Sequence, residues 1–246
     1  MFIYLADLKR LRIAEDYDEL LSGMDEEAVK RIERFKFENG RYMALMRQIV
    51  LDYVFYETFG SCRVALKADL NGKPRIEGIT DPDGKAFDNS AFKDFDFNIS
   101  HSGEVLVIVS GKGRAGIDVE QASRIKDVDK LTRFFYKDEE NRVNKAEDPK
   151  DEFCRIWTFR EAFSKEEGVG IPLFENEEIK IDYDENKVFY KNTGFRFYEY
   201  GYPGFRITCC VKKDEEKPEL LSIDETLWSG MTETVIKFAK ARSFMV

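Results

Sequence analysis

Two long helical patterns dominate the chain, and a group of β-strand patterns follows each of them. The first helix is expected over residues 40–58, with Gly60 as its stop, and the second over residues 151–167, with the glycines of GVG at its end. An RFFYKDEE segment before the second helix echoes an RFKFENG segment before the first. Two halves with the same order of elements suggest an internal duplication.

Shorter patterns fill the intervals between these helices. A polar helix is expected over residues 25–35, capped by its first residue. Apolar and alternating runs predict strands at residues 1–8, 95–100, 105–111, 115–120, 178–183, 187–191, 195–200 and 205–211. The strands of residues 105–111 and 115–120 are expected to form a hairpin across a GKGR turn, and residues 69–90 hold most of the turn signals in the first half. The chain from Asp214 onward is interpreted as a C-terminal appendage.

The composition is that of a globular protein of one large or two small domains. The chain has 246 residues, of which 43% are hydrophobic and 35% charged. A net charge of −9 argues against nucleic-acid binding through bulk electrostatics, so we expect no nucleic-acid partner. Six basic residues nevertheless cluster within one short segment: Lys30, Arg31, Arg34, Lys36, Arg41 and Arg47. They are either the solvated face of a helix or a local anion site.

Four cysteines, Cys62, Cys154, Cys209 and Cys210, lack the spacing of a structural zinc site. No signal peptide is recognised at the start of the sequence, which favours a reduced, cytoplasmic protein. No run approaches the roughly 20 apolar residues of a membrane helix, so we expect no membrane association.

The single histidine, His101, lies in the segment NISHSG of residues 98–103. Asn, Ser and Gly are ordinary turn residues, so a turn histidine is one interpretation and a ligand contact is another. Upstream, Gly72, Lys73 and Pro74 predict a turn that projects one lysine.

A strand pattern places two carboxylates on one face. In the segment GIDVE, Asp118 and Glu120 point the same way, about 6–7 Å apart, while Ile117 and Val119 point to the other side. This pattern is typical of a half-buried strand. It is also typical of a hard-cation site, because Mg²⁺ takes one or two protein carboxylates and leaves its other positions to water and substrate phosphates.

A third carboxylate lies on the second long helix. Glu161 and Lys165 are four residues apart in WTFREAFSKEEGVG, at the edge of an apolar arc. The pair is either an exposed ion pair worth a few tenths of a kcal/mol or part of the wall of a site. In a site, the carboxylate could hold a metal or take a proton and the lysine could meet a phosphate.

The order of these segments resembles the 4′-phosphopantetheinyl transferases, specifically the long pseudo-dimeric type that activates peptide and polyketide synthetases. The resemblance runs from the basic helix near Lys30 to about Trp228. It implies an α+β fold of two similar subdomains related by a pseudo-two-fold axis, each a small, mainly antiparallel sheet packed on a long helix. Residues 1–112 would form the first subdomain, with the coenzyme A nucleotide contacts. Residues 113–246 would form the second, with the metal and catalytic residues and a C-terminal extension, and the protein would be a monomer.

The resemblance also implies an activity. Phosphopantetheine would move from coenzyme A to a serine hydroxyl of an acyl or peptidyl carrier protein, with Mg²⁺, releasing 3′,5′-ADP. Asp118, Glu120 and Glu161 match the acidic residues that hold Mg²⁺, and Glu161 also matches the favoured general base. Lys165 matches the lysine that meets the phosphates, so Glu161, Lys165 and Asp118 form the expected catalytic set.

Other positions match residues that bind coenzyme A. Ser100 and His101 match contacts to the nucleotide, with the histidine near the 3′-phosphate, and Lys73 with Pro74 matches a coenzyme A-contacting turn. The family often has two lysines at the 3′-phosphate where this chain has Ala28 and Arg31. We expect Arg31 to bind there, with compensation from Arg41 or Arg47.

Arg160 departs from the pattern, because it replaces a lysine of the family. The change is conservative only if the contact is neither bidentate nor stacked.

Two other functions fit the same residues. The chain could be a coenzyme A-binding protein that has lost catalysis, although the three carboxylates and Lys165 argue against this. It could also be a Mg²⁺-dependent phosphohydrolase with water as the nucleophile. The sequence leaves open which carrier protein is served and whether acyl-coenzyme A is accepted.

Overall fold

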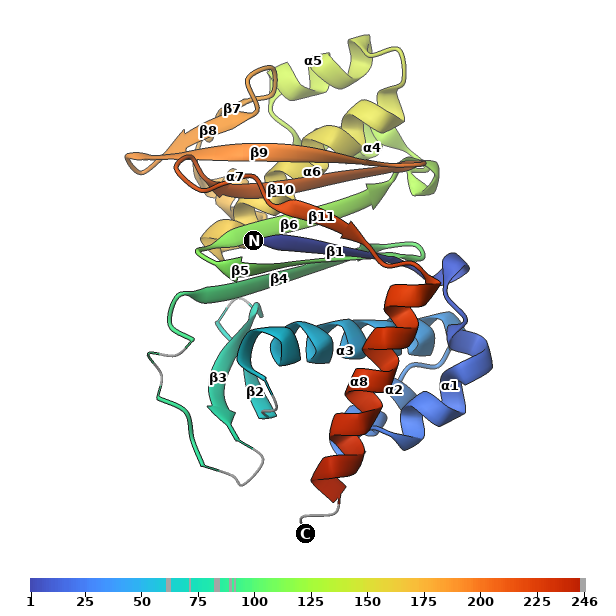
Figure 1. Cartoon of the computed structure of the whole chain (residues 1–246). Coiled ribbons are helices and arrows are strands. Elements are labelled where there is room, and N and C mark those ends of the chain that lie inside the picture. The colour runs from blue at the N-terminus through green and yellow to red at the C-terminus, as the bar shows by residue number, and fades with distance from the viewer. Residues whose placement is uncertain (61–62, 71, 82–84, 89, 91, 244–246) are drawn as a thin grey trace.

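The computed structural model describes residues 1–60, 63–70, 72–81, 85–88, 90 and 92–243. The fold is α+β, with two stacked sheets that lie between helical layers (Figure 1). The first sheet has the order β11-β1-β5-β4 and contains β1 (Phe2–Asp7), β4 (Phe95–Ser102), β5 (Val105–Lys112) and β11 (Glu219–Ser222). The second has the order β6-β10-β9-β8-β7 and contains β6 (Ala115–Gln121), β7 (Ile181–Asp182), β8 (Lys187–Tyr190), β9 (Thr193–Tyr202) and β10 (Phe205–Lys212). A separate hairpin pairs β2 (Arg63–Ala68) with β3 (Pro74–Thr80).

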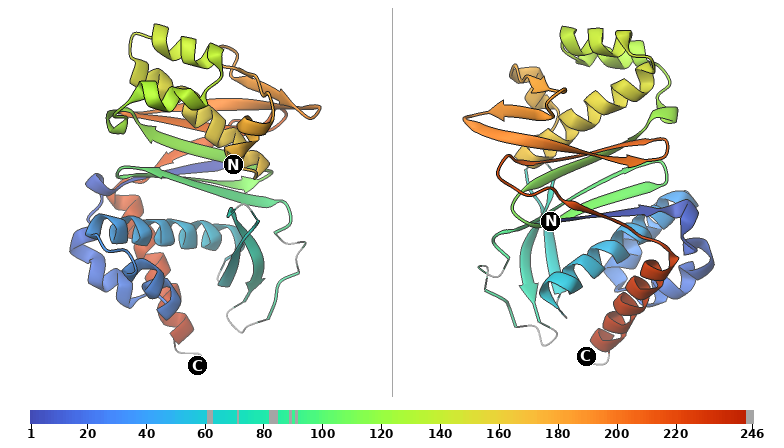
Figure 2. Two further views of the ribbon diagram at one scale, coloured as in Figure 1. Left: turned by 180° about the vertical axis from the view of Figure 1, so that it is seen from behind. Right: turned by 45° about the horizontal axis from the view of Figure 1, so that its top comes forward.

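The helices cover the outer faces of the two sheets, as the further views in Figure 2 also show. On the side of the first sheet are α1 (Ile13–Ser22), α2 (Glu26–Glu33), α3 (Glu38–Phe59) and α8 (Glu225–Ser243). On the side of the second sheet are α4 (Val128–Leu131), α5 (Lys137–Lys145), α6 (Pro149–Glu167) and α7 (Pro172–Asn176). Short 3₁₀ turns occur at Leu8–Arg10, Ala122–Arg124 and Thr132–Phe134. None of the helices in the described part of the chain is long and apolar enough to cross a membrane.

The helix ends follow the expected signals. The carboxylate of Asp25 accepts a hydrogen bond from the amide of Ala28 at 2.7 Å and so caps α2. Helix α3 stops at Gly60 with φ 74°, and α6 stops at Gly168 with φ 76°. A glycine adopts such positive φ without the steric cost that a side chain would add, so both helices end where the sequence predicts.

The expected hairpin between residues 105–111 and 115–120 is wrong. Strand β5 pairs with β4 through a tight turn at Gly103 (φ 58°), whereas β6 pairs with β10 in the other sheet. The GKGR segment, with Gly111 and Gly113 at positive φ, carries the chain from one sheet to the other. Alternation marks a strand with two different faces, but it does not identify the strand's partner.

The turn interpretation of NISHSG is wrong for most of the segment. Asn98 and His101 lie within strand β4, where they pair with Val109 and Leu106 of β5. The turn begins only at Gly103.

The two halves share a topology. In the first sheet the antiparallel order is β1-β5-β4, and in the second it is β6-β10-β9. Helix α3 follows β1 and α6 follows β6 in the chain, and each precedes the other two strands of its set. The repeated element order of the sequence therefore corresponds to the same arrangement of three strands and one long helix.

The C-terminal segment is part of the first half and not an appendage. Strand β11 pairs parallel with β1, and α8 packs beside α3. Trp228, Met231 and Val235 are buried in the same core as α3. A division of the chain at residue 112 therefore separates these residues from the sheet that they extend.

A shared apolar layer joins the two sheets. Ile3, Val107 and Val109 of the first sheet pack with Ile117 and Val119 of the second, and all five are inaccessible to solvent. Burying side chains of this size contributes about 1.5–3 kcal/mol each. Three of the four cysteines lie in the described part of the chain, and Cys154, Cys209 and Cys210 are buried free thiols in the cores. Cys62 lies outside the described residues.

Helix α6 lies directly on β6. A Cβ atom on Gly116 would stand 1.9 Å from the carbonyl oxygen of Ala162, so only glycine permits this approach. The contact sets how closely α6 packs against β6.

The same contact buries a carboxylate, that of Glu166, completely. The Arg114 guanidinium is 3.6 Å from one of its oxygens. Burial and the neighbouring Glu167 raise the pKa of Glu166 to about 7 from 4.5, and the Arg114 charge opposes the rise.

We predict that Glu166→Gln stabilises the protein at alkaline pH. The pKa of Glu166 is raised on folding, so the folded state binds the proton more tightly than the unfolded state does. The free energy of unfolding that this proton binding contributes is lost as the pH rises from about 4.5 to about 7. At pH 8 the substitution should raise the free energy of unfolding by about 1–3 kcal/mol and at pH 4 by little. Urea unfolding at both pH values measures this, with Glu175→Gln on the exposed surface of α7 as the control. Equal effects at the two pH values would contradict the prediction.

Candidate functional site

The candidate site lies where the edge strands of the two sheets meet. Strand β4 is at the edge of the first sheet and β6 at the edge of the second. The Ser100 hydroxyl donates to Asp118 Oδ1 at 2.6 Å, and the Ser102 hydroxyl donates to Glu120 Oε2 at 2.9 Å. Two serines of NISHSG therefore bind the two same-face carboxylates of GIDVE.

Lys165 from the last turn of α6 completes this group. Its ammonium donates to Asp118 Oδ1 at 2.7 Å and to the Ser100 hydroxyl at 3.1 Å. Asp118 is only 3% exposed. A buried carboxylate needs such partners, because desolvation of an unpaired charge is costly.

The third carboxylate, that of Glu161, belongs to the same electrostatic group. Burial raises the pKa of Glu161, the charge of Lys165 lowers it and the charge of Asp118 raises it. Burial and the Asp118 charge likewise raise the pKa of Glu120, against the hydrogen bond from Ser102 and the charge of Lys165. The three acidic residues singled out in the sequence therefore lie close enough to repel one another.

The donor set is suited to a hard cation. Asp118 Oδ2 is buried and has no hydrogen-bond partner in the described structure, which leaves one carboxylate oxygen available to a ligand. Over the described ranges, no three His, Cys, Asp or Glu side chains are arranged as a formed metal site. The Lys165 ammonium lies against Asp118 Oδ1 instead. Oxygen donors and several carboxylates are nevertheless the chemistry that Mg²⁺ requires.

His101 lies on the opposite face of β4 from the two serines, because successive strand residues alternate. Its side chain is solvent-accessible. Partial burial lowers the pKa of its imidazole, the charges of Arg47, Lys165 and Arg124 lower it further, and Asp118 opposes them. The histidine is therefore in a predominantly cationic environment.

A group of arginines adjoins this histidine. Arg47 of α3 is half-buried, and burial lowers its pKa together with the charges of Arg34 and Arg31. Arg31 donates to the side-chain oxygen of Gln48 at 3.3 Å. The charges of Arg47, Lys165 and Arg124 near one imidazole form a local positive centre on an acidic protein, as an anion site requires.

Arg41 is directed elsewhere. Its guanidinium donates to the carbonyl oxygens of Phe35 and Lys36, at 3.3 and 3.5 Å, in the connection between α2 and α3. Of the two alternatives for compensation, Arg47 and not Arg41 is the one next to His101.

Lys73 and Pro74 lie next to the last turn of α6. Pro74 opens strand β3, and Lys73 is buried with 8% of its surface exposed. The Lys73 ammonium donates to Asp96 Oδ2 at 3.0 Å and to the carbonyl oxygen of Lys165 at 3.2 Å.

Arg160 points away from the acidic group and into the core. Its guanidinium packs over the rings of Phe135, Tyr136 and Phe174 and donates to the carbonyl oxygen of Phe134 at 2.8 Å. The contact is stacked, so the exchange of lysine for arginine at this position is not a conservative one.

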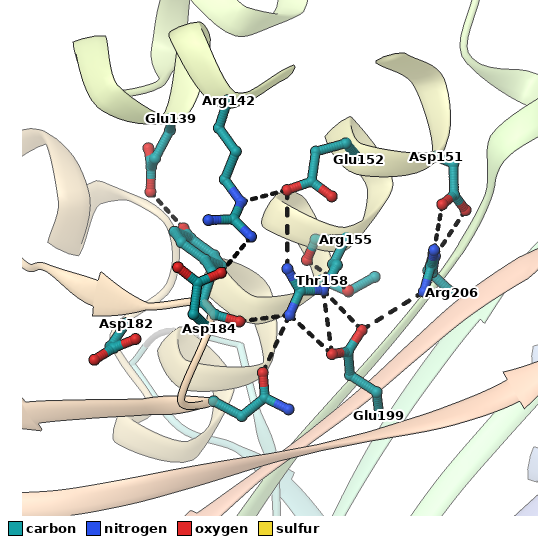
Figure 3. Close-up of polar contacts among 12 residues, drawn as sticks. Glu139, Arg142, Asp151, Glu152, Arg155, Thr158, Asp182, Asp184, Glu199 and Arg206 are labelled. Carbon is teal, nitrogen blue, oxygen red and sulfur yellow. Dashed lines mark hydrogen bonds and ion pairs between the residues drawn. The ribbon is translucent and has the colours of Figure 1, made fainter. Parts of the chain in front are cut away.

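Ion pairs hold the first turns of α6 on the second sheet (Figure 3). Arg155 donates to both oxygens of Glu199 on β9, at 3.0–3.1 Å, and Arg206 on β10 pairs with Asp151. A hollow of about 600 Å³ at this end is lined by Ala146, Glu147, Asp148, Pro149, Asp151 and Glu152. Its acidic lining does not suit an anionic ligand, and the chemistry described above lies toward the other end of the helix.

Comparison with known proteins decides the family. A sequence model described as the 4′-phosphopantetheinyl transferase superfamily matches residues 114–210, and one described as the N-terminal part of a 4′-phosphopantetheinyl transferase matches residues 12–113. The chain belongs to the 4′-phosphopantetheinyl transferase superfamily. Membership places it among the transferases, and the two matches meet where the chain passes from the first sheet to the second.

Individual relatives within this superfamily are distant. The chain is 27% identical over 177 residues to the 4′-phosphopantetheinyl transferase ffp of Bacillus subtilis, across 70% of this chain and 73% of that protein. It is 29% identical over 143 residues to psf-1 of Bacillus pumilus, across 56% and 55% of the two chains. It is 32% identical over 130 residues to gsp of Aneurinibacillus migulanus, across 48% and 53%. The matched part thus spans about half the length of the last two relatives.

We predict that Arg47→Gln raises the pKa of His101, because it removes a nearby positive charge that disfavours the imidazolium. His101 is the only histidine of the chain, so its ring resonance in a proton NMR titration is unambiguous. Arg41→Gln is the control and should leave the titration unchanged. An unchanged midpoint in Arg47→Gln would show that Arg47 is not next to the histidine.

Proposed function

We propose that the protein transfers the 4′-phosphopantetheine group from coenzyme A to a serine of an acyl or peptidyl carrier protein, with Mg²⁺, and releases 3′,5′-ADP. The observation that carries the proposal is the contact of Lys165 and Ser100 with the buried Asp118, in a group that includes Glu120 and Glu161. A phosphate-binding cation beside three carboxylates is what transfer from a pyrophosphate requires.

Asp118, Glu120 and Glu161 would hold the metal, which supplies Lewis-acid stabilisation of the charge that develops on the pyrophosphate. In the transfer, a bond forms between the serine oxygen and the phosphorus atom attached to pantetheine. The bond from that phosphorus to the bridging oxygen breaks, and 3′,5′-ADP leaves with the electron pair.

Glu161 is the proposed base for the serine proton. A carboxylate whose pKa is raised by burial is a better proton acceptor near neutral pH than an exposed one. Lys165 is the proposed contact to the phosphates, since its ammonium is already at the carboxylate edge.

The positive centre around His101 is the proposed site of the 3′-phosphate. Arg47 is half-buried there, with Arg31 and Arg34 nearby. Ser100 and the turn at Pro74 remain proposed contacts to the nucleotide portion of coenzyme A.

Three further features belong to the proposal. The common order β1-β5-β4 and β6-β10-β9, each with one long helix, supports two subdomains related by a pseudo-two-fold axis. Such an internal pair would allow the protein to act as a monomer. Free buried thiols are compatible with a reducing, cytoplasmic location.

Two alternatives lead to different products. A protein that only binds coenzyme A would leave it intact, and a phosphohydrolase would split it with water. The transfer proposal predicts that incubation with coenzyme A, Mg²⁺ and an apo carrier protein increases the mass of the carrier by one phosphopantetheinyl group, as mass spectrometry would detect. Unmodified carrier with intact or hydrolysed coenzyme A would support one of the alternatives.

We predict that Asp118→Asn and Glu161→Gln each lower the transfer rate by at least about 100-fold, because they remove a metal ligand and the proposed base. Circular dichroism and thermal unfolding should show that both variants fold. Glu178→Gln, an exposed carboxylate of the same half, is the matched control. Wild-type turnover in either site variant would refute the metal assignment.

We further predict that Arg47→Gln raises the KM for coenzyme A by about 10-fold, the cost of losing a charge-assisted hydrogen bond. The KM for 3′-dephospho-coenzyme A should change by less than about 2-fold, since that substrate lacks the group that Arg47 contacts. Equal increases for both substrates would place Arg47 elsewhere on the ligand.

A further inference from the structure

The last turn of α6 has carbonyl groups that no helical amide can satisfy, as every helix end does. The Ser164 carbonyl accepts from the amide of Gly168 at 2.8 Å. The next two accept from side chains far away in the sequence. The Lys165 carbonyl accepts from the Lys73 ammonium at 3.2 Å, and the Glu166 carbonyl accepts from the Arg114 guanidinium. Cations at this end also complement the helix dipole.

Lys73 links this helix end to the first half of the molecule. It precedes strand β3 at the turn of the β2–β3 hairpin, and its partner Asp96 lies on β4. Asp96 is 11% exposed, and Arg75 from the same hairpin donates to its other oxygen at 2.9 Å. A continuous series of contacts therefore runs from Asp96 through Lys73 to the backbone of Lys165, whose side chain binds Asp118.

This arrangement does not favour Lys73 as a phosphate ligand. Its ammonium already donates to Asp96 and to the Lys165 carbonyl, and it is nearly inaccessible to solvent. A phosphate that approached it would also meet the negative charge of Asp96. Lys165, by contrast, has a side chain that is 26% exposed and lies at the edge of the carboxylate group.

We propose that Lys73, held by Asp96, is a positioning residue that fixes the last turn of α6 and so directs the Lys165 ammonium to the reacting phosphates. The assignment of Lys165 to the phosphates rests on the proposed function. The position of the helix end does not rest on it and can be tested separately.

The test uses Lys73→Met, which keeps the length of the side chain, and Asp96→Asn, which keeps a hydrogen-bond acceptor. Both should lower kcat for transfer by about 10–100-fold, because a displacement of about 1 Å can cost about 100-fold in rate. The Kd for coenzyme A by calorimetry should change by less than about 2-fold. Lys67→Met is the matched control, since Lys67 is on the same hairpin and pairs with Glu77 at the surface. It should behave as the wild type.

Asp96→Asn distinguishes the positioning role of Lys73 from direct binding of the phosphates by Lys73. If Lys73 bound the phosphates directly, loss of the Asp96 charge would tighten coenzyme A binding or leave the rate unchanged, and Lys73→Met would raise the Kd. Either result overturns the proposal. A double-mutant cycle gives a second test, because Lys73→Met should have no further effect on the residual rate of Lys165→Met.

Amide hydrogen exchange tests the positioning without catalysis. Residues 164–168 should exchange faster in Lys73→Met and Asp96→Asn than in the wild type and in Lys67→Met, since the helix end loses its partner. Unchanged exchange in folded variants would overturn the positioning role. Absence of transfer by the wild type, with faster exchange in the variants, would contradict only the proposed function.

Discussion

The burial of Asp118 is the constraint on which the rest of the site depends. A carboxylate that is 3% exposed is tolerated only if hydrogen bonds and a counter-charge replace its water. Ser100 on strand β4 of the first sheet and Lys165 on helix α6 provide these. The two halves of the chain must therefore pack in one arrangement for Oδ1 of this carboxylate to be hydrogen-bonded.

Helix α6 carries Lys165 to that position because it is held at both ends and along its length. Arg155 and Arg206 tie its first turns to β9 and β10, and Lys73 with Arg114 binds its last carbonyls. Between the ends, the missing Cβ of Gly116 lets the helix lie on β6. A rigid element with fixed ends can place an ammonium more precisely than a loop could.

Local sequence patterns predict which side chains share a strand face and where the long helices end. They do not predict the contacts between segments that are distant in the sequence. Alternation in GIDVE correctly places Asp118 and Glu120 on one face, and the glycine signals correctly end the long helices. The partner of each strand could not be predicted, because alternation is the same whether β6 pairs with β5 or packs across from it. The contact of Lys73 with residue 165 spans 92 positions, and no local pattern reports it. Family resemblance therefore selected the candidate residues, whereas their contacts could be read only from the fold.

Strand β4 explains how one short polar segment can serve two kinds of chemistry. Its serines face the carboxylates of β6, whereas His101, one residue later than Ser100, lies on the other face, and burial together with the positive charge of Arg47 on α3 lowers its pKa. An acidic region and a basic region thus lie on opposite faces of the same strand. A ligand with a pyrophosphate at one end and a separate phosphate at the other would span the strand edge. The strand period of two residues, and not the composition of the segment, sets this division.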